Sequence, residues 1–175
     1  FAERGSATDI ALIFSNDGYK IHRPFPEAWI RPGADPERWQ NRANYLAWNG
    51  HSAVDGQLNF FHVRSQVRYS LRADGFTSLS SGVNPGEWRS LKLQVTGDEI
   101  SFNVSTSAGG GFTVALFDEA GRELPGFGFD DCKEFFGDSL EMRPCWRGGK
   151  ALLAPGTYFS IGGRFHEASL FSFTH

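Results

Sequence analysis

Aromatic side chains and planar hydrogen-bonding side chains are concentrated between residues 22 and 51. Guanidinium, amide and carboxylate groups bond sugar hydroxyls in fixed directions, and a flat indole ring stacks on the C–H face of a pyranose. The segment therefore predicts a carbohydrate-binding site. Its side chains of these kinds are His22, Arg23, Glu27, Trp29, Arg31, Arg38, Trp39, Asn41, Arg42, Asn44, Trp48 and His51. Among them, the candidate ligand-binding residues are Trp29, Trp39, Asn41, Arg42, Trp48 and His51.

The same residues also fit a long surface loop that binds nothing. In that interpretation the tryptophans attach the loop to the core, and the arginines are solvated. A loop of this length inside a compact domain is usually functional or disordered, and its three tryptophans argue against disorder. Both the binding interpretation and the surface-loop interpretation stay open on composition alone.

Acidic pairs are the only other candidates for chemistry. They are Asp98-Glu99, Asp118-Glu119 and Asp130-Asp131. Adjacent residues on a strand point to opposite faces, and aspartate is common in turns, so we assign no catalytic residue to these pairs. The five histidines have no metal-ligand spacing, and nucleotide-binding and hydrolase motifs are missing from the sequence. We therefore predict neither a metal nor a cofactor.

Overall composition narrows the class of protein. The 175 residues are 40% hydrophobic and 21% charged, which is typical of a folded domain. A net charge of −3 gives no electrostatic reason to expect a nucleic-acid or anionic-membrane partner. No apolar run approaches the roughly 20 residues of a membrane span. The chain begins at Phe1 without a signal-like segment, which suggests a processed or truncated chain.

Two cysteines, Cys132 and Cys145, complete the inventory of reactive side chains. Their spacing is not that of a CxxC pair and no histidine pair stands nearby, so a zinc site is not expected. They form one disulfide if the protein is exported, or else they are two buried thiols. The sequence leaves both states open.

The sequence predicts that β-strands hold the candidate site residues in place. The 17 Phe and 21 Gly favour pleated surfaces joined by frequent turns. In the first half, strands are expected at residues 10–15, 19–22, 45–48, 57–64 and in the alternating segment 66–79. Turns are expected at Asn16–Gly18, Asn49-Gly50 and Asp74-Gly75. Prolines make 23–38 a long loop.

After Gly82–Gly86 the pattern changes to short strands at regular spacing. They are expected within 88–95, 100–104, 112–117, 151–165 and 170–173, with one short turn of helix at 130–136. The SAGGG segment at 107–111 is expected to be a hairpin loop. Regularly spaced short strands indicate an antiparallel β-sandwich, so the predicted fold is all-β. Two domains are predicted, one of residues 1–86 and one of residues 87–175.

Several phrases resemble a known group of proteins, the five-bladed β-propeller glycosidases of the family 32, 43 and 62 type. SNDGYKIHRP at 15–24 resembles their blade motif, and VRYSLRADGFTSLSSG at 67–82 resembles the phrase that ends the propeller. The C-terminal sandwich often fused to these enzymes is similar to three further segments, which are 101–132, 137–146 and 167–175. The resemblance implies a last propeller-blade-like antiparallel sheet followed by a β-sandwich.

The resemblance also implies what this chain lacks. The catalytic carboxylates of such enzymes lie on earlier blades, and Gln40 stands where an acidic residue usually follows the tryptophan, so no catalytic residue is carried over. Trp39, Asn41 and Arg42 match a blade's contribution to a pocket. The implied function is an accessory module that binds poly- or oligosaccharides, in an extracellular or periplasmic setting. The alternatives are a structural domain that stabilises the remainder of a propeller, and part of a glycoside hydrolase whose carboxylates lie outside this chain.

Overall fold

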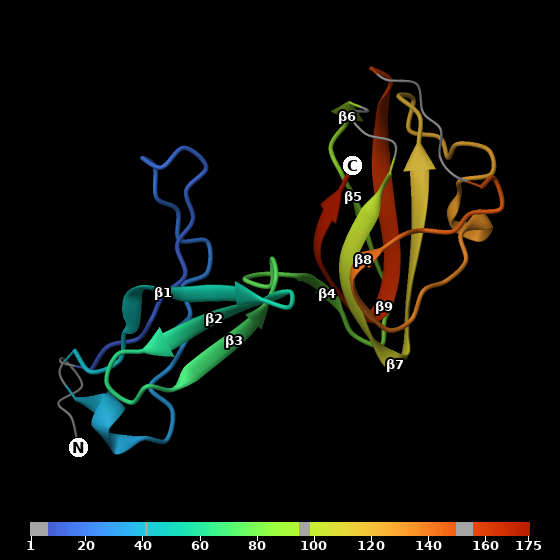
Figure 1. Cartoon of the computed structure of the whole chain (residues 1–175). Helices are drawn as coiled ribbons and strands as arrows, with labels where there is room; N and C mark the ends of the chain where they lie inside the picture. The colour runs from blue at the N-terminus through green and yellow to red at the C-terminus, as the bar shows by residue number, and fades with distance from the viewer. Residues whose placement is uncertain (1–6, 41, 95–98, 150–155) are drawn as a thin grey trace. The chain divides into compact units, whose positions relative to one another are not determined.

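The computed structural model describes residues 7–40, 42–94, 99–149 and 156–175 (Figure 1). The chain divides into two compact units, Phe1–Ala73 and Asp74–His175, and each is described by itself. Nearly all regular structure in both units is antiparallel β-sheet, which confirms the predicted all-β fold with a sandwich-like second unit.

The first unit contains a three-stranded sheet in the order β1-β2-β3. Its strands are β1 (Leu46–Val54), β2 (Gln57–His62) and β3 (Arg68–Arg72), all antiparallel. Asp55 and Gly56 join β1 to β2 with φ values of 49° and 72°, the pair of positive angles that a tight type I′ hairpin needs. β3 lies within the alternating segment predicted at 66–79, and the predicted turn at Asp74-Gly75 follows it.

The sequence predicted that the strand at 45–48 ends in a turn at Asn49-Gly50, and this prediction is wrong. β1 continues through this pair to Val54, and the pairing with β2 shifts between Leu46 and His51. Asn49-Gly50 therefore lies in an irregular stretch of the strand. The physical reason is that Asp55-Gly56, six residues later, supplies an equally good turn and leaves a longer pairing between the two strands.

Residues 7–40 and 42–45 form loops and one helical turn instead of the strands predicted at 10–15 and 19–22. Single bridges, Phe14 with His22 and Ile10 with Ile30, are all that remains of those strands. The turn between them is present: the Asp17 carboxylate accepts hydrogen bonds from the backbone N–H groups of Tyr19 and Lys20, both at 2.8 Å. The helical turn η1 (Pro36–Trp39) begins after Asp35, whose side chain caps it.

The second unit is built around two long strands (Figure 1). Its elements are β4 (Leu79–Ser81), β5 (Gly86–Arg89), β6 (Leu93–Gln94), β7 (Ser101–Phe117), η2 (Phe129–Asp131), β8 (Asp138–Met142) and β9 (Tyr158–Thr174). β4, β5 and β6 pair with successive parts of β9, β7 pairs with β9 along most of its length, and β8 pairs with the first half of β7. The resulting core holds Phe102, Val104, Phe112, Val114, Leu116, Met142, Trp146, Phe159, Ile161, Phe165, Ala168 and Leu170.

The SAGGG segment is not the predicted hairpin loop but part of β7. The pairing of β7 with β9 shifts between Thr106 and Gly111, which marks a bulge. A Cβ on Gly110 would lie 2.5 Å from the carbonyl oxygen of Glu167 and 2.8 Å from that of His166. The glycines therefore let two strands approach closely at the bulge.

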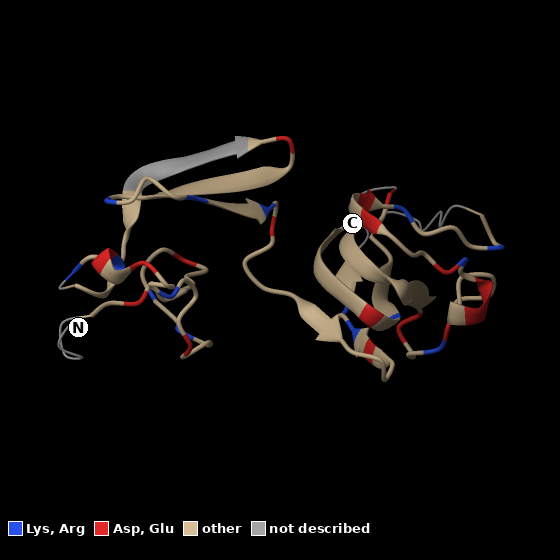
Figure 2. Cartoon of the chain, turned by 90° about the horizontal axis from the view of Figure 1, so that it is seen from below, with Lys and Arg blue, Asp and Glu red and all other residues tan. Residues whose placement is uncertain are grey.

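Residues 74–86 lie with the second unit, whereas the sequence placed the limit between residues 86 and 87. β4 pairs with β9, and the Ser172 hydroxyl donates a hydrogen bond to the Asp74 carboxylate at 2.7 Å. Both cysteines are free thiols in this structure, and they differ from the expected pair of buried thiols because Cys132 is half-buried and Cys145 is exposed. No helix among the described residues has the length and apolar character of a membrane span. Basic and acidic residues alternate along the chain in both units, as the blue and red stretches of the ribbon show (Figure 2).

Candidate functional site

A surface hollow of about 530 Å³ lies in the first unit, at the point where the N-terminal segment meets the start of β1. It is lined by Thr8, Asp9, Ile10, Arg42, Asn44, Tyr45 and Leu46. Two segments more than thirty residues apart in the sequence therefore build one concave surface. Its volume lies in the range of small-molecule binding pockets.

The wall of the hollow is fixed by hydrogen bonds. The Ile10 backbone pairs with Ile30, and the Asn44 side-chain amide donates to the Ile30 carbonyl at 3.1 Å. The Arg38 guanidinium donates to the amide oxygen of Asn44 at 2.7 Å. Because both ends of its amide are used and the residue is 2% exposed, Asn44 is a structural part of the wall.

Three polar side chains on this surface remain available to a ligand. Asp9, Arg42 and Tyr45 are exposed, and none of their side chains makes a hydrogen bond or ion pair with another described residue. The Tyr45 side chain, 43% exposed, adds an aromatic ring to the residues that line the same hollow. The hollow thus combines an acceptor, a forked cationic donor and an aromatic ring.

Arg42 is the one predicted site residue that lines this hollow within the described residues. Trp29 packs its ring edge-to-face against Phe60, with centroids 5.5 Å apart. The Trp39 indole N–H donates to the Gly33 carbonyl at 2.7 Å. Trp29 therefore attaches the loop to the sheet, whereas Trp39 bonds within the loop and stays 44% exposed. Asn41 lies outside the described residues, and so do the side chains of Trp48 and His51, although their backbones belong to β1.

Sequence reasoning missed Asp9 and Tyr45. Tyr45 precedes a strand and Asp9 precedes an apolar run, so each looks ordinary by itself. They are brought together by long-range contacts: the Ile10–Ile30 bridge and weak 3.4 Å hydrogen bonds that join the Thr8 hydroxyl to the Asn44 backbone. No local pattern encodes these contacts.

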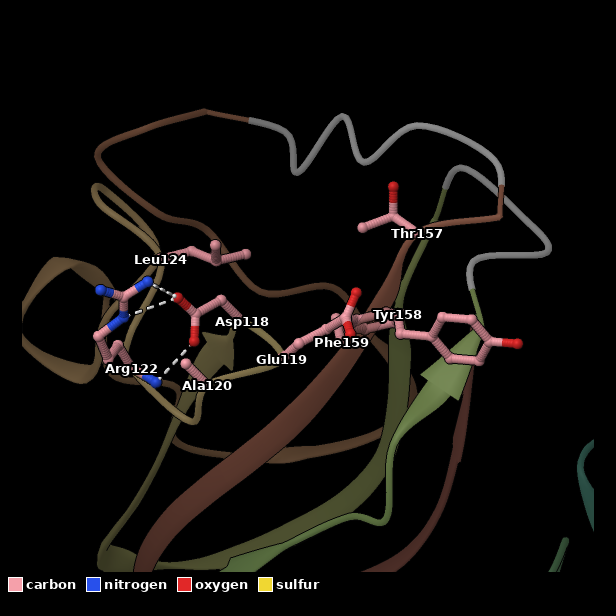
Figure 3. Close-up of a pocket in the computed structure, with 8 residues that line it drawn as sticks. All are labelled: Asp118, Glu119, Ala120, Arg122, Leu124, Thr157, Tyr158 and Phe159. Carbon is pink, nitrogen blue, oxygen red and sulfur yellow. Dashed lines mark hydrogen bonds and ion pairs between the residues drawn. The ribbon is translucent and has the colours of Figure 1, made fainter.

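A smaller hollow of about 310 Å³ lies in the second unit, in the turn after β7 and at the start of β9 (Figure 3). It is lined by Asp118, Glu119, Ala120, Arg122, Leu124, Thr157, Tyr158 and Phe159. Arg122 binds Asp118 through its side chain, with a 2.9 Å bond from Nε, and its backbone N–H donates to the same carboxylate.

These bonds hold the Asp118 pKa below its ordinary value, the Arg122 backbone N–H contributing most. Tyr158 extends away from the Asp118–Arg122 pair (Figure 3). The acidic pair predicted as a turn is therefore a turn, and its aspartate is engaged in holding that turn.

Within residues 7–40, 42–94, 99–149 and 156–175, no three histidine, cysteine, aspartate or glutamate side chains gather in a way that could hold a metal ion. No family model, curated protein or solved structure matches the chain. The resemblance to propeller glycosidases therefore stays a prediction that rests on the quoted motifs.

Proposed function

We propose that this chain is a carbohydrate-binding accessory module and that the hollow lined by Asp9, Arg42 and Tyr45 holds the sugar. The observation that carries the proposal is the set of three unengaged polar side chains on one concave surface. Sugars present closely spaced hydroxyls around an apolar ring face, so they need donors, acceptors and an aromatic ring at the same place.

Each side chain has a distinct role in this proposal. The Asp9 carboxylate accepts hydrogen bonds from two hydroxyls, and the Arg42 guanidinium donates two parallel N–H groups to neighbouring oxygens. The Tyr45 ring packs against the C–H face of the same sugar. Asn44 keeps Arg42 and Tyr45 in place without touching the ligand through its amide, since that amide is occupied by Arg38 and Ile30.

The test is calorimetric titration of the full chain with a panel of neutral and acidic poly- and oligosaccharides. We expect at least one glycan to bind, and Arg42→Ala and Asp9→Asn each to raise its Kd by about tenfold, since a hydrogen bond to a charged group contributes roughly 1.5–3 kcal/mol. Arg68→Ala is the matched control, because Arg68 is an exposed arginine of β3 outside the hollow. Failure of every glycan to bind, or equal losses in the control, would overturn the proposal.

A structural role is the second candidate, and exposed apolar side chains favour it. Tyr19 is 91% exposed, and Ile21 and Val54 are exposed as well. β1 and β3 are the two edges of a sheet of only three strands. In this candidate the first unit packs on further sheets, such as the remainder of a propeller, and catalytic carboxylates of a glycoside hydrolase come from outside this chain.

Sedimentation of the chain over a range of concentrations separates the candidates. Self-association that masks Tyr19 and the strand edges, together with no glycan binding, supports the structural role. A monomer that binds a glycan through Arg42 contradicts it.

A further inference from the structure

Buried polar side chains form a cluster beneath the loop that covers the three-stranded sheet. Arg38 is 8% exposed and His62 is 1% exposed, and the hydroxyl of Tyr69 is buried as well. Each of these side chains has one polar atom that makes no hydrogen bond within the described residues: Nε of Arg38, Nε2 of His62 and the phenol oxygen of Tyr69. Unpaired buried polar atoms are rare, so this group needs an explanation.

Arg38 brings a buried positive charge to the cluster, and none of its hydrogen-bond acceptors is charged. Its Nη2 donates to the amide oxygen of Asn44 at 2.7 Å and to the carbonyl of Arg31 at 3.5 Å, and both acceptors are neutral. No ion pair among the described residues joins Arg38 to a carboxylate. Burying a charge is costly unless an opposite charge accompanies it.

His62 contributes a neutral donor. The backbone N–H of Ser65 can only donate, so Nδ1 of His62 accepts its hydrogen bond, at 3.1 Å. The proton of the neutral ring is therefore on Nε2. Burial, followed by the charge of Arg38, holds the pKa of His62 below its ordinary value, so the ring is neutral at pH 7. The Ala43 backbone acts in the opposite direction, yet Nε2 has no hydrogen-bond partner of good geometry among the described residues.

Tyr69 faces the same region. Tyr69 pairs with Phe60 across β2 and β3, and His62 follows Phe60 by two residues. The side chains of Tyr69 and His62 therefore lie on the same face of the sheet as that of Phe60. The guanidinium carbon of Arg38 lies 5.4 Å from the centre of the Tyr69 ring. The Arg38 guanidinium, the His62 N–H and the Tyr69 O–H thus lie in one buried region, and the Nε–H, Nε2–H and O–H groups lack an acceptor of good geometry among the described residues.

We propose that Arg38, His62 and Tyr69 bind a small monovalent inorganic anion of the halide class. Such an ion accepts all three hydrogen bonds and neutralises the guanidinium. A buried water molecule would satisfy the donors but leave the charge uncompensated. This site is distinct from the proposed glycan site, because Asn44 stands between them: its backbone and side chain help to wall the hollow, and its amide oxygen holds Arg38.

The direct test is a crystal of the full chain grown with sodium bromide, measured at the bromine absorption edge. We expect an anomalous peak within about 3.5 Å of Nε of Arg38, Nε2 of His62 and the Tyr69 oxygen. Density without an anomalous signal there, which would be a water molecule, or no density at all, would overturn the proposal.

A solution test covers the case in which crystals do not form. The thermal midpoint of the chain is measured against halide concentration, with gluconate keeping the ionic strength at about 0.15 M. We expect halide to raise the midpoint and Tyr69→Phe to weaken the apparent halide affinity by about tenfold, since it removes one donor and leaves the ring. Tyr19→Phe is the control, because Tyr19 is exposed on the same unit. Equal midpoints in halide and gluconate, or an equal halide response in Tyr69→Phe, would overturn the proposal.

Discussion

Asn44 is the residue whose replacement most sharply tests how the first unit is held together. Asn44→Ala removes the acceptor of the 2.7 Å bond from Arg38 and the donor of the 3.1 Å bond to the Ile30 carbonyl. A bond to a charged group contributes roughly 1.5–3 kcal/mol and a neutral one roughly 0.5–1.5 kcal/mol. We therefore expect a loss of about 3 kcal/mol in the free energy of unfolding of this unit.

Hydrogen exchange read amide by amide is the suitable assay, because each unit reports on itself. A loss of about 3 kcal/mol corresponds to roughly hundredfold faster exchange of the protected amides of β2 and β3. The amides of β7 and β9 serve as the internal control and should keep their protection. Asn44→Asp should lose less, since its carboxylate still accepts from Arg38. Unchanged protection in β2 and β3, or an equal loss in β7 and β9, would refute this account of Asn44.

Three further outcomes follow from substitution or modification of single residues. Folding lowers the pKa of His62, so the unfolded state takes up a proton first as the pH falls. The stability of the first unit should therefore decrease below about pH 6.5, by at most about 1.4 kcal/mol per pH unit. Denaturation at a series of pH values measures this slope, and His62→Gln should remove it. Gly110→Ala should destabilise the second unit by roughly 1–3 kcal/mol in chemical denaturation, whereas Gly82→Ala, where a Cβ meets nothing within 4 Å, should not. Partial burial raises the pKa of the Cys132 thiol, so iodoacetamide should alkylate the exposed Cys145 first, as mass spectrometry can follow; equal rates would contradict the shielding of Cys132.

Period-two patterns and glycine turns could be read from the sequence where one face of a strand is apolar. Tyr69 and Leu71 alternate with polar residues and do form β3, and the turn at Asp74-Gly75 follows it. The all-β class follows from the same signals repeated along the chain. These features are local, so a single sequence contains them.

Features that depend on partners far away in the sequence could not be predicted. Asn49-Gly50 and the glycines at 109–111 have strong turn propensity, yet pairing of the residues on either side with β2 and with β9 keeps both inside strands. The candidate site in the first unit likewise depends on contacts between residues far apart in the sequence. Arg42 was predicted from its type, whereas Asp9 and Tyr45 become site residues only because Thr8 and Ile10 contact residues 44 and 30.

The central claim is that a glycan binds the hollow of the first unit. The most direct measurement is the change in backbone amide chemical shifts of the ¹⁵N-labelled chain on titration with the tightest-binding oligosaccharide of the panel. The claim predicts that the largest changes fall at Asp9, Arg42 and Tyr45, which line the hollow. No change with any glycan, or changes confined to Glu119 and Tyr158 in the second unit, would contradict it.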